Sequence, residues 1–354
     1  MGIYDSKLWL SDLDEVLKTL PEIGDLAGKT VMVTGASGLI CSALVDVLVR
    51  WNGTHEGKIS ILAAGRNGDA IAKRFAPYSR EEWFDFIPYD ASSPEKIVLE
   101  RPCDYIVHGA SNASPGKILA EPVETMLDNV LGMKRLLDCA KEHGTRRVLF
   151  VSSSEVYGRK EHDRPCKNDE YGWIDILNPR SSYSIGKCAA ETMCAAYHAE
   201  YGVESVIVRP GHVYGPTASE SDTRVSSAWA YAAARGEALV MKSDGSQIRS
   251  YCYCLDCASA MLKAMLKGNN IHAYNISNPD SIVNIRGMAE ILAKTAGVEL
   301  KMELPTEAEK KGFNPMSNSS LDSSDLLALG WKGLFDAERG FSHTVEILKE
   351  MLAL

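Results

Sequence analysis

The chain of 354 residues is 45% hydrophobic and 24% charged, which is the usage of an ordinary globular protein and excludes a disordered or fibrous one. Its 38 basic and 47 acidic residues give a formal net charge of -9, without a dense run of Lys and Arg, which argues against a nucleic-acid partner. No segment approaches the roughly 18 consecutive apolar residues of a membrane span, and the acidic N-terminal segment is unlike a secretory signal. We therefore expect a cytoplasmic protein without a membrane partner.

The nine cysteines are odd in number and scattered along the chain, so a complete disulfide framework is impossible and reduced thiols are expected. Cys252, Cys254 and Cys257 stand close together, as metal ligands do. However, alternating hydrophobicity through Tyr251 to Leu255 predicts a buried strand, and no second Cys or His group stands at a zinc-ligand spacing. We therefore predict no metal.

In chain order, residues 1–28 form the first predicted unit, an amphipathic helical extension that packs on the rest of the protein. Ser11 is its predicted N-cap, and Pro21 and Gly24 end it. The apolar positions at helical spacing are Leu13, Val16, Leu17 and Leu20.

From Lys29 onward, short apolar strands alternate with helices. The predicted strands are Thr30 to Thr34, Lys58 to Ala63, Phe86 to Tyr89, Tyr105 to His108, Val148 to Ser152 and Ser205 to Val208. The clearest predicted helices are Leu39 to Arg50, Pro122 to His143 and Ser182 to Tyr201, with Gly144 and Gly202 at C-cap positions. Because strands that are apolar throughout must be covered on both faces, the pattern predicts an α/β protein with a Rossmann-type, doubly wound parallel sheet.

After about Arg209 the alternation loosens, which predicts a smaller α/β lobe for the substrate. We therefore divide the chain into the extension 1–28, a dinucleotide-binding domain 29–208 and a substrate lobe 209–354. Segments near 249–256 are candidates to return to the first sheet.

A glycine turn follows the first predicted strand and opens a helix. It runs Thr34-Gly35-Ala36-Ser37-Gly38-Leu39-Ile40-Cys41. Glycines at such a turn let the backbone approach a pyrophosphate, and the free amides of the helix end meet its charge. The sequence therefore predicts a dinucleotide site at Gly35, Ser37, Gly38, Leu39 and Ile40. Cys41 stands where a third small residue is usual, so the match is imperfect.

The second and third strands carry further cofactor signals. Proteins that prefer NAD normally have an acid after the second strand, to bind the ribose hydroxyls, but Arg66 stands in that region here. Arg66 is equally compatible with a 2′-phosphate or a solvated loop position, so NAD is expected and NADP stays open. Asp90, followed by Ala91, is placed to accept a hydrogen bond from the adenine amino group.

Tyr183 and Lys187 lie four residues apart and therefore on one face of a predicted helix, where the ammonium can lower the pKa of the phenol. One such pair is expected by chance in a chain with 14 tyrosines, so its context decides. The serine run at 152–154 ends a strand at the carboxyl edge of the predicted sheet, where ligands bind. Together these features predict a general base next to the dinucleotide.

With these motifs, the sequence from Lys29 to about Trp331 resembles the extended short-chain dehydrogenase/reductase family of nucleotide-sugar epimerases, dehydratases and decarboxylases. The resemblance implies that Ser153, Tyr183 and Lys187 are catalytic. It also implies a nicotinamide-side loop at 108–115 and a segment at 209–216 that leads to the sugar nucleotide. The cofactor contacts implied there are Gly109, Ala110, Ser111 and Val213, and the substrate contacts are Ser114, Ser154 and Arg249, the last on the diphosphate.

The family mechanism, carried over by this resemblance, oxidises the sugar at C4 while a retained nicotinamide cofactor takes the hydride. The 4-keto sugar then becomes open to epimerisation, dehydration or decarboxylation. Glu155 resembles a carboxylate of dehydratases and decarboxylases, whereas Ser154 replaces the usual dehydratase acid and argues against dehydration. Decarboxylases resemble one another in an Arg before the Leu-Gly-Trp segment, and residues 314–321 contain none.

The leading hypothesis is therefore an enzyme that acts at C4 of a nucleoside-diphosphate sugar. Decarboxylation or dehydration ranks slightly above 4-epimerisation. An NADPH-dependent reductase of a keto-sugar nucleotide is the alternative that Arg66 suggests, and a dinucleotide-sensing protein without turnover is a third. His108 and His212 are expected to be structural. Relatives of this type often dimerise through the helices at 122–143 and 182–201, so a homodimer is expected.

Overall fold

The computed structural model describes residues 2–303, 306 and 316–353. Its centre is a seven-stranded sheet in the order β10-β6-β5-β4-β1-β2-β3, in which every neighbouring pair is parallel. The strands are β1 (Thr30–Thr34), β2 (Ser60–Gly65), β3 (Phe84–Pro88), β4 (Tyr105–His108), β5 (Arg147–Val151), β6 (Ser205–Pro210) and β10 (Ala273–Ile276). The predicted Rossmann-type fold is confirmed.

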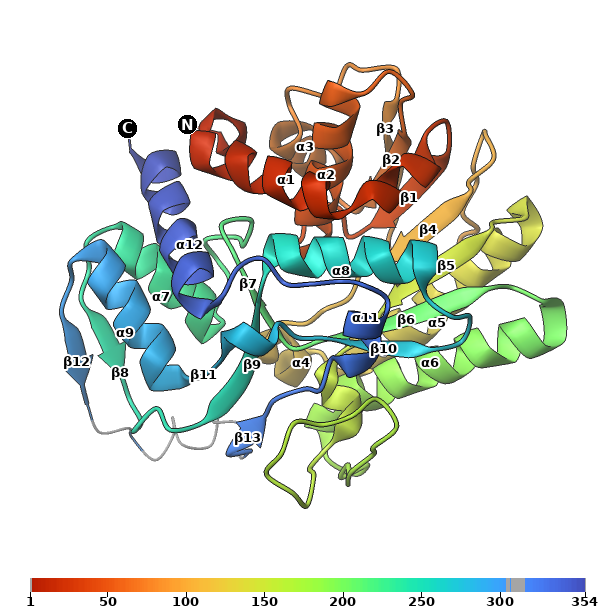
Figure 1. The fold of residues 1–354 in the computed structure, drawn as a ribbon. Helices are drawn as coiled ribbons and strands as arrows, with labels where there is room; N and C mark the ends of the chain where they lie inside the picture. Colours follow the sequence, from red (N-terminus) through yellow and green to blue (C-terminus); the bar gives the residue numbers. More distant parts are fainter. Residues whose placement is uncertain (1, 304–305, 307–315, 354) are drawn as a thin grey trace.

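Helices cover both faces of the central strands of this sheet, which explains why β1, β4, β5 and β6 are largely buried, whereas the edge strand β3 is mostly exposed. Val31 and Val33 point into the core shared with α2 (Leu39–Thr54) and α8 (Cys254–Lys267), whereas Met32 points to the opposite face. That second face is covered by α5 (Pro122–His143) and α6 (Ser182–Tyr201), which pack side by side (Figure 1).

The predicted elements of this sheet agree well with the structure. β1, β4, α5 and α6 have the predicted limits, while β2, β3, β5, β6 and α2 differ only at their ends. Gly144 (φ 62°) and Gly202 (φ 72°) end α5 and α6 in the left-handed conformation, as their positions predicted.

The N-terminal segment folds into η1 (Ile3–Asp5), α1 (Lys7–Thr19) and η2 (Pro21–Leu26), so a helical extension is present. The predicted N-cap Ser11 is wrong, because Ser11 lies inside α1. Ser6 caps the helix instead, and its hydroxyl accepts a hydrogen bond from the Trp9 backbone N–H at 3.2 Å. The helix starts more than one turn earlier because this second serine offers the same capping chemistry upstream.

A smaller lobe lies beside the main sheet (Figure 1). Its strand β9 (Ile248–Tyr253) pairs with β7 (His212–Tyr214), β11 (Ile282–Asn284) and β13 (Asn318–Ser319), and β8 (Leu239–Met241) pairs with β12 (Leu300–Met302). Its helices are α7 (Val225–Ala234), α9 (Ile285–Ala296), α11 (Ser324–Ala328) and α12 (Ala337–Leu352). The remaining short helices are α3 (Gly68–Arg74), α4 (Pro115–Ala120), η3 (Ser154–Tyr157), η4 (Pro179–Ser181) and η5 (Pro279–Ser281).

The expectations for residues 249–256 need correction. No strand there joins the main sheet, because β9 pairs only within the small sheet. The strand predicted over Tyr251 to Leu255 stops at Tyr253, and Cys254 begins α8, which covers the main sheet and leads to β10. Period-two alternation cannot distinguish a strand end from a buried helix start. We propose that the dinucleotide-binding lobe comprises residues 29–208 together with 254–276.

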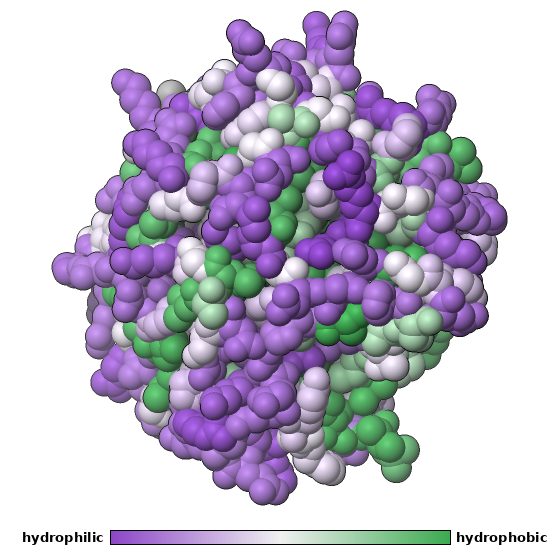
Figure 2. All heavy atoms as spheres, turned by 45° about the vertical axis from the view of Figure 1, so that its right-hand side comes forward, coloured by the Kyte–Doolittle hydropathy of each residue, from purple (hydrophilic) through white to green (hydrophobic). Residues whose placement is uncertain are grey.

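The surface in Figure 2 is mostly hydrophilic, and hydrophobic side chains gather toward its lower right. Among the described helices, none combines the length and apolar character needed to cross a bilayer. The described residues also contain no group of three or more His, Cys, Asp or Glu side chains arranged to hold a metal ion. All nine cysteines are free thiols.

Candidate active site

The predicted site residues gather where the parallel strands of the main sheet end. The carboxyl ends of β1 to β5 lead in turn to the turn 35–40, Arg66, Asp90 with Ala91, the loop 109–111 and the serines 153–154. Tyr183 and Lys187 join them from the first two turns of α6. Because parallel strands end at one edge, residues from six separate segments face the same region.

The turn between β1 and α2 has the backbone shape that a pyrophosphate site needs. Gly35 has a φ of 69°, and a Cβ added there would lie 3.0 Å from the Ala110 Cα. The Gly38 N–H donates to the Gly35 carbonyl at 2.8 Å, and α2 begins immediately afterwards with the N–H groups of Leu39 and Ile40. The first N–H groups of a helix have no acceptor within it. This turn therefore fits a dinucleotide.

Cys41, the departure from the usual small residue, is accommodated by Gly109 at the end of β4. A Cβ on Gly109 would lie 2.2 Å from the Cys41 sulfur, so the thiol fills the space that any larger residue at 109 would need. Burial raises the pKa of the Cys41 thiol to about 12, which keeps it uncharged. The close approach of α2 to β4 is thus retained with the small residue on the strand.

His108 is a neutral structural residue, as expected. Its Nδ1 lies 2.8 Å from the Thr34 hydroxyl, which also accepts a hydrogen bond from the Ala110 N–H at 3.3 Å. Burial lowers the pKa of His108 to about 3, with help from the Lys187 charge. The imidazole therefore ties β4 to β1 and does not exchange protons near neutral pH.

The region expected to hold the adenosine has carboxylates around Arg66. The exposed Arg66 guanidinium acts on the charges of both Asp90 and Asp128. Hydrogen bonds from Ser92, at 3.0 Å from its backbone N–H and 2.9 Å from its hydroxyl, hold the pKa of Asp90 below its usual range. Burial and the charge of Asp90 raise the pKa of Asp128. The positive charge of Arg66 is therefore partly offset by two acidic groups in the same region.

Ser153, Glu155 and Tyr183 come together at the mouth of β5. The side chain of Ser153 lies close enough to Tyr183 to lower the pKa of its phenol, and the Ser153 oxygen accepts a hydrogen bond from the Glu155 N–H at 3.2 Å. Glu155 is paired with Arg180, which donates to its carboxylate at 2.9 Å from the turn preceding α6. A hydroxyl, a phenol and a carboxylate thus converge from two elements.

The prediction that Lys187 lowers the pKa of Tyr183 is wrong in this structure. Burial raises the pKa of Tyr183 to about 12, Glu155 raises it further, and the groups that oppose this are Ser153, Arg224 and Arg180. The Lys187 ammonium instead donates to the Val151 carbonyl at 2.9 Å and lies 5.7 Å from the Tyr183 ring centroid. Burial lowers the pKa of Lys187 itself to about 7. The helical spacing is as predicted, but burial dominates both ionisations.

The substrate side of the site is basic. Arg249 on β9 is buried and donates to the carbonyl oxygens of Ile248 (2.8 Å) and Met316 (3.0 Å), and no carboxylate among the described residues pairs with it. Arg224, the N-cap residue of α7, is held by Asp222 and acts on Tyr183 and on His212. Burial and these two arginines lower the pKa of His212 to about 4. The site therefore offers positive charge to an anionic ligand.

The other predicted substrate and cofactor contacts lie at the following positions. Ser114 is the N-cap residue of α4, Ser154 begins η3, and Ser111 donates to Asn129 at 3.0 Å. Val213 lies in β7, packed in the hydrophobic core. Arg180 and Arg224 were missed by sequence reasoning, because neither belongs to a motif and both reach Tyr183 only through the fold.

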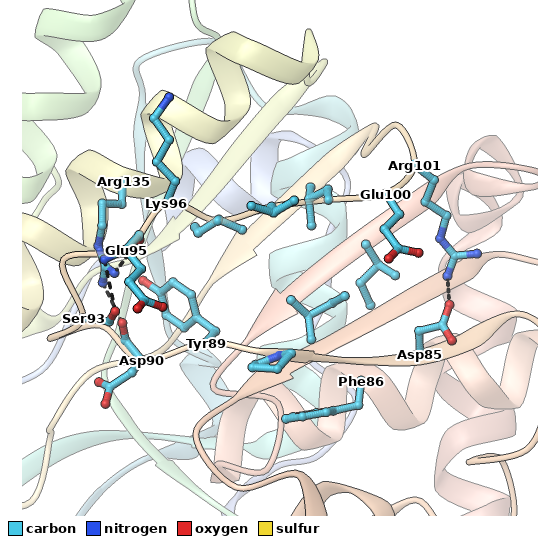
Figure 3. A pocket seen from close by; sticks show the side chains of 16 residues that line it. Asp85, Phe86, Tyr89, Asp90, Ser93, Glu95, Lys96, Glu100, Arg101 and Arg135 are labelled. Carbon is cyan, nitrogen blue, oxygen red and sulfur yellow. Dashed lines mark hydrogen bonds and ion pairs between the residues drawn. The ribbon is translucent and has the colours of Figure 1, made fainter.

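A cavity of about 670 Å³ lies between the free edge of β3 and the segment 93–101, and it meets the candidate site at Asp90 (Figure 3). It contains Asp90 and Arg135, whose guanidinium donates to the Asp90 carbonyl at 2.6 Å, but none of Ser153, Tyr183 or Lys187. The cavity exists because the connection from β3 to β4 contains no helix to cover the sheet. We therefore place the candidate active site at the strand ends, where the chemistry converges.

Comparison with known proteins gives one family match. Residues 31–277 match the model of the NAD dependent epimerase/dehydratase family. Among curated proteins, UDP-glucuronic acid decarboxylase 1 of Xenopus tropicalis is 29% identical over 326 residues, which cover 92% of this chain and 73% of the relative. UDP-glucuronic acid decarboxylase 3 of Arabidopsis thaliana is 31% identical over 305 residues, 85% of this chain and 84% of the relative.

Solved structures share the fold. The dTDP-glucose 4,6-dehydratase of Bacillus anthracis, determined in complex with NAD, superposes with a TM-score of 0.75 at 19% identity. The superposition covers 91% of this chain and 97% of that one. At this identity the likeness concerns the fold alone. The superposition includes both lobes of this chain.

Proposed function

Because this chain belongs to the NAD-dependent epimerase/dehydratase family, we propose that it oxidises C4 of a nucleoside-diphosphate sugar and returns its cofactor in the starting form. The observation that carries the proposal is the meeting of Ser153, Glu155 and Tyr183 beside the glycine turn of β1. A base (Tyr183), a hydroxyl that can hold the substrate (Ser153) and a dinucleotide turn at one sheet edge provide what this oxidation needs.

In this proposal Tyr183 takes the proton of the C4 hydroxyl while Ser153 holds that hydroxyl in place. Bound NAD supplies the acceptor for the C4 hydride and a positive charge that favours the phenolate. The turn 35–40 would hold its pyrophosphate, and Lys187 and the loop 109–111 would hold its nicotinamide half. Closing Tyr183 away from water lets Ser153 orient the proton transfer without competition from solvent.

For the second step we favour decarboxylation of a uronic acid. A C4 ketone makes a C6 carboxylate a β-keto acid, so the C5–C6 bond can break and carbon dioxide can leave. The bonding electrons stay on the sugar as the enolate of the C4 ketone, which then takes up a proton at C5 before the hydride returns to C4. The absence of an Arg in residues 314–321, of which 314–315 lie outside the described residues, removes one carboxylate partner. Arg180 and Arg224, which lower the pKa of Tyr183 and are themselves paired with Glu155 and Asp222, are our candidates to replace it. Ser154 is too weak an acid to expel a hydroxyl.

The test uses the NAD-loaded enzyme with a panel of UDP-, dTDP-, GDP- and CDP-sugars that includes UDP-glucuronic acid. We expect release of carbon dioxide and formation of a UDP-pentose from UDP-glucuronic acid, and no product from the Tyr183→Phe variant. A 4-keto-6-deoxy product would instead indicate dehydration, and an axial–equatorial exchange by NMR would indicate epimerisation. An unaltered panel, with Tyr183→Phe indistinguishable from wild type, would refute the proposal.

We also propose a homodimer formed through α5. Val123, Leu127 and Leu131 recur at four-residue spacing on that helix and are between 44% and 63% exposed, and Leu119 on α4 is 62% exposed. An apolar helix stripe of this kind is more typical of an interface than of solvent. Sedimentation should give a dimer for the wild type and a monomer for Leu127→Lys, whereas Glu142→Lys, on an exposed polar position of the same helix, should stay dimeric. A monomeric wild type would exclude this interface.

For the compartment, we propose the cytoplasm. All nine cysteines are free, and unpaired cysteines in this number are typical of reducing compartments. Titration of thiols in the purified, unfolded protein without reductant should give nine per chain. A clearly lower count would argue for an oxidising compartment.

A further inference from the structure

Glu191 is a buried carboxylate one turn beyond Lys187 on α6, and its side chain is only 13% exposed. One oxygen accepts hydrogen bonds from the Ser152 hydroxyl (2.5 Å) and from Nε of Arg209 (3.0 Å). The other accepts Nη2 of Arg209 at 2.6 Å. The carboxylate is thus fixed between the ends of β5 and β6.

Lys187 is anchored at the same place. Its ammonium donates to the carbonyl of Val151, the residue before Ser152, so Glu191 and Lys187 are held by consecutive residues at the end of β5. Residues four apart on a helix are neighbours on its surface. The acidic Glu191 and the basic Lys187 therefore lie on one face of α6, two turns and one turn beyond Tyr183, without a direct ion pair between them.

We infer that Glu191 is a positioning residue that keeps Lys187 in its charged form behind Tyr183, with Ser152 and Arg209 fixing the carboxylate for this purpose. The inference deepens the proposed function, on which it rests for its catalytic meaning. The sequence signal was available, since Glu191 follows Lys187 by the same four residues that separate Lys187 from Tyr183.

The titratable groups that face Lys187 from α2 and β4 are uncharged and therefore cannot stabilise its ammonium as Glu191 can. On α2, burial keeps the Cys41 thiol uncharged, with a pKa of about 12. On β4, burial keeps His108 neutral at physiological pH, with a pKa of about 3. Burial drives the pKa of Lys187 down to about 7, and Glu191 is the largest influence in the opposite direction.

Arg209 on β6 is the remaining charged neighbour. Besides its contacts to Glu191, its guanidinium donates to the Tyr157 hydroxyl (3.0 Å), the Asn168 carbonyl (2.7 Å) and the Tyr171 hydroxyl (3.0 Å). The Nε and both terminal nitrogens of Arg209 therefore donate hydrogen bonds to groups other than Lys187. It orients Glu191 and offsets the cost of burying that charge.

The decisive experiment measures the titration of Lys187 directly. In protein with isotope-labelled lysine, the ε-carbon NMR shift of Lys187, assigned by its loss in Lys187→Met, is followed against pH without substrate. In Glu191→Gln we expect the midpoint to fall by about one pH unit or more, the usual effect of removing an adjacent opposite charge. Asp46→Asn, which breaks another buried ion pair, with Arg74, should leave the midpoint unchanged.

Removing Glu191 leaves Arg209 buried without its counter-ion, which endangers folding. Glu191→Gln combined with Arg209→Met removes both charges and should shift the midpoint in the same direction. An unchanged Lys187 midpoint in either folded variant would overturn the inference. With an active enzyme, the alkaline limb of the pH profile of sugar oxidation should move to lower pH in both variants. Since the NMR titration needs no turnover, a panel of unreactive sugars would defeat the proposed function and leave this inference to be decided separately.

Discussion

Arg249 is a buried cation whose position lowers the free energy of unfolding of the protein. Its guanidinium is buried, burial lowers its pKa, and its described hydrogen-bond partners are two carbonyl oxygens without a negative charge. Burying a cation without a counter-ion is costly. Such a residue is expected where an anionic ligand completes the site, and the diphosphate of the proposed substrate is such a ligand.

We therefore expect Arg249→Met to separate binding from stability. The KM for the nucleotide sugar should rise at least about tenfold, because a charge-assisted contact contributes about 1.5–3 kcal/mol. The free energy of unfolding should stay the same or rise by about 1 kcal/mol, since an unpaired buried charge is removed. Steady-state kinetics and urea denaturation check both. Destabilisation together with an unchanged KM would show that Arg249 is purely structural.

At the scale of elements, the contact between α2 and β4 decides how closely the cofactor turn approaches the sheet. Cys41 on α2 and Gly109 after β4 fill one space between them, with 2.2 Å between the sulfur and the Cβ that Gly109 lacks. The usual arrangement places the small residue on the helix, and this chain places it on the strand side. The two positions should therefore be coupled.

We expect Gly109→Ala to destabilise the protein by about 1–3 kcal/mol through overpacking, and to weaken NAD binding because the turn must shift. Adding Cys41→Gly should restore most of the lost stability and most of the NAD binding, because the sulfur that collides with the new methyl group is gone. A double-mutant cycle on the free energy of unfolding measures the coupling. Additive effects of the two changes would contradict this account.

At the scale of the whole molecule, the N-terminal segment joins the two lobes. From α1, Asp14 pairs with Arg50 of α2 at 2.7 Å, and Glu15 pairs with Arg339 of α12 at 2.5 Å. The two chain ends accordingly lie near each other (Figure 1). Helix α1 thereby links α2, which begins at the glycine turn, to α12, the last helix of the smaller lobe.

Cofactor binding at the turn 35–40 should stabilise the whole fold. NAD at about 100 times its Kd should raise the free energy of unfolding by about 2.7 kcal/mol. NADP at the same concentration should stabilise less, because Asp90 and Asp128 beside Arg66 repel a 2′-phosphate. Thermal unfolding with each cofactor checks this, and Arg66→Ala should widen the difference. Equal stabilisation by NADP would reverse the assignment of cofactor preference.

What the sequence determined by itself follows local rules. The strands of the main sheet, the glycine caps of α5 and α6 and the turn at Gly35 depend on neighbours in the chain. All are found where they were predicted, although the ends of β2, β3, β5 and β6 differ. That strand ends gather at one edge is equally fixed, because parallel strands allow no other arrangement.

Tertiary structure decided whatever depends on burial and on contacts distant in sequence. The pKa of Tyr183 is raised where a lower value was expected, because interior desolvation outweighs the nearby charges, and burial also lowers the pKa of Lys187. Cys41 is tolerated only because Gly109, 68 residues away, lacks a side chain. The boundary between β9 and α8 was set by packing, because β9 pairs within the small sheet whereas α8 packs on the main sheet. A one-dimensional pattern records which residues are apolar, whereas only packing decides what each of them meets.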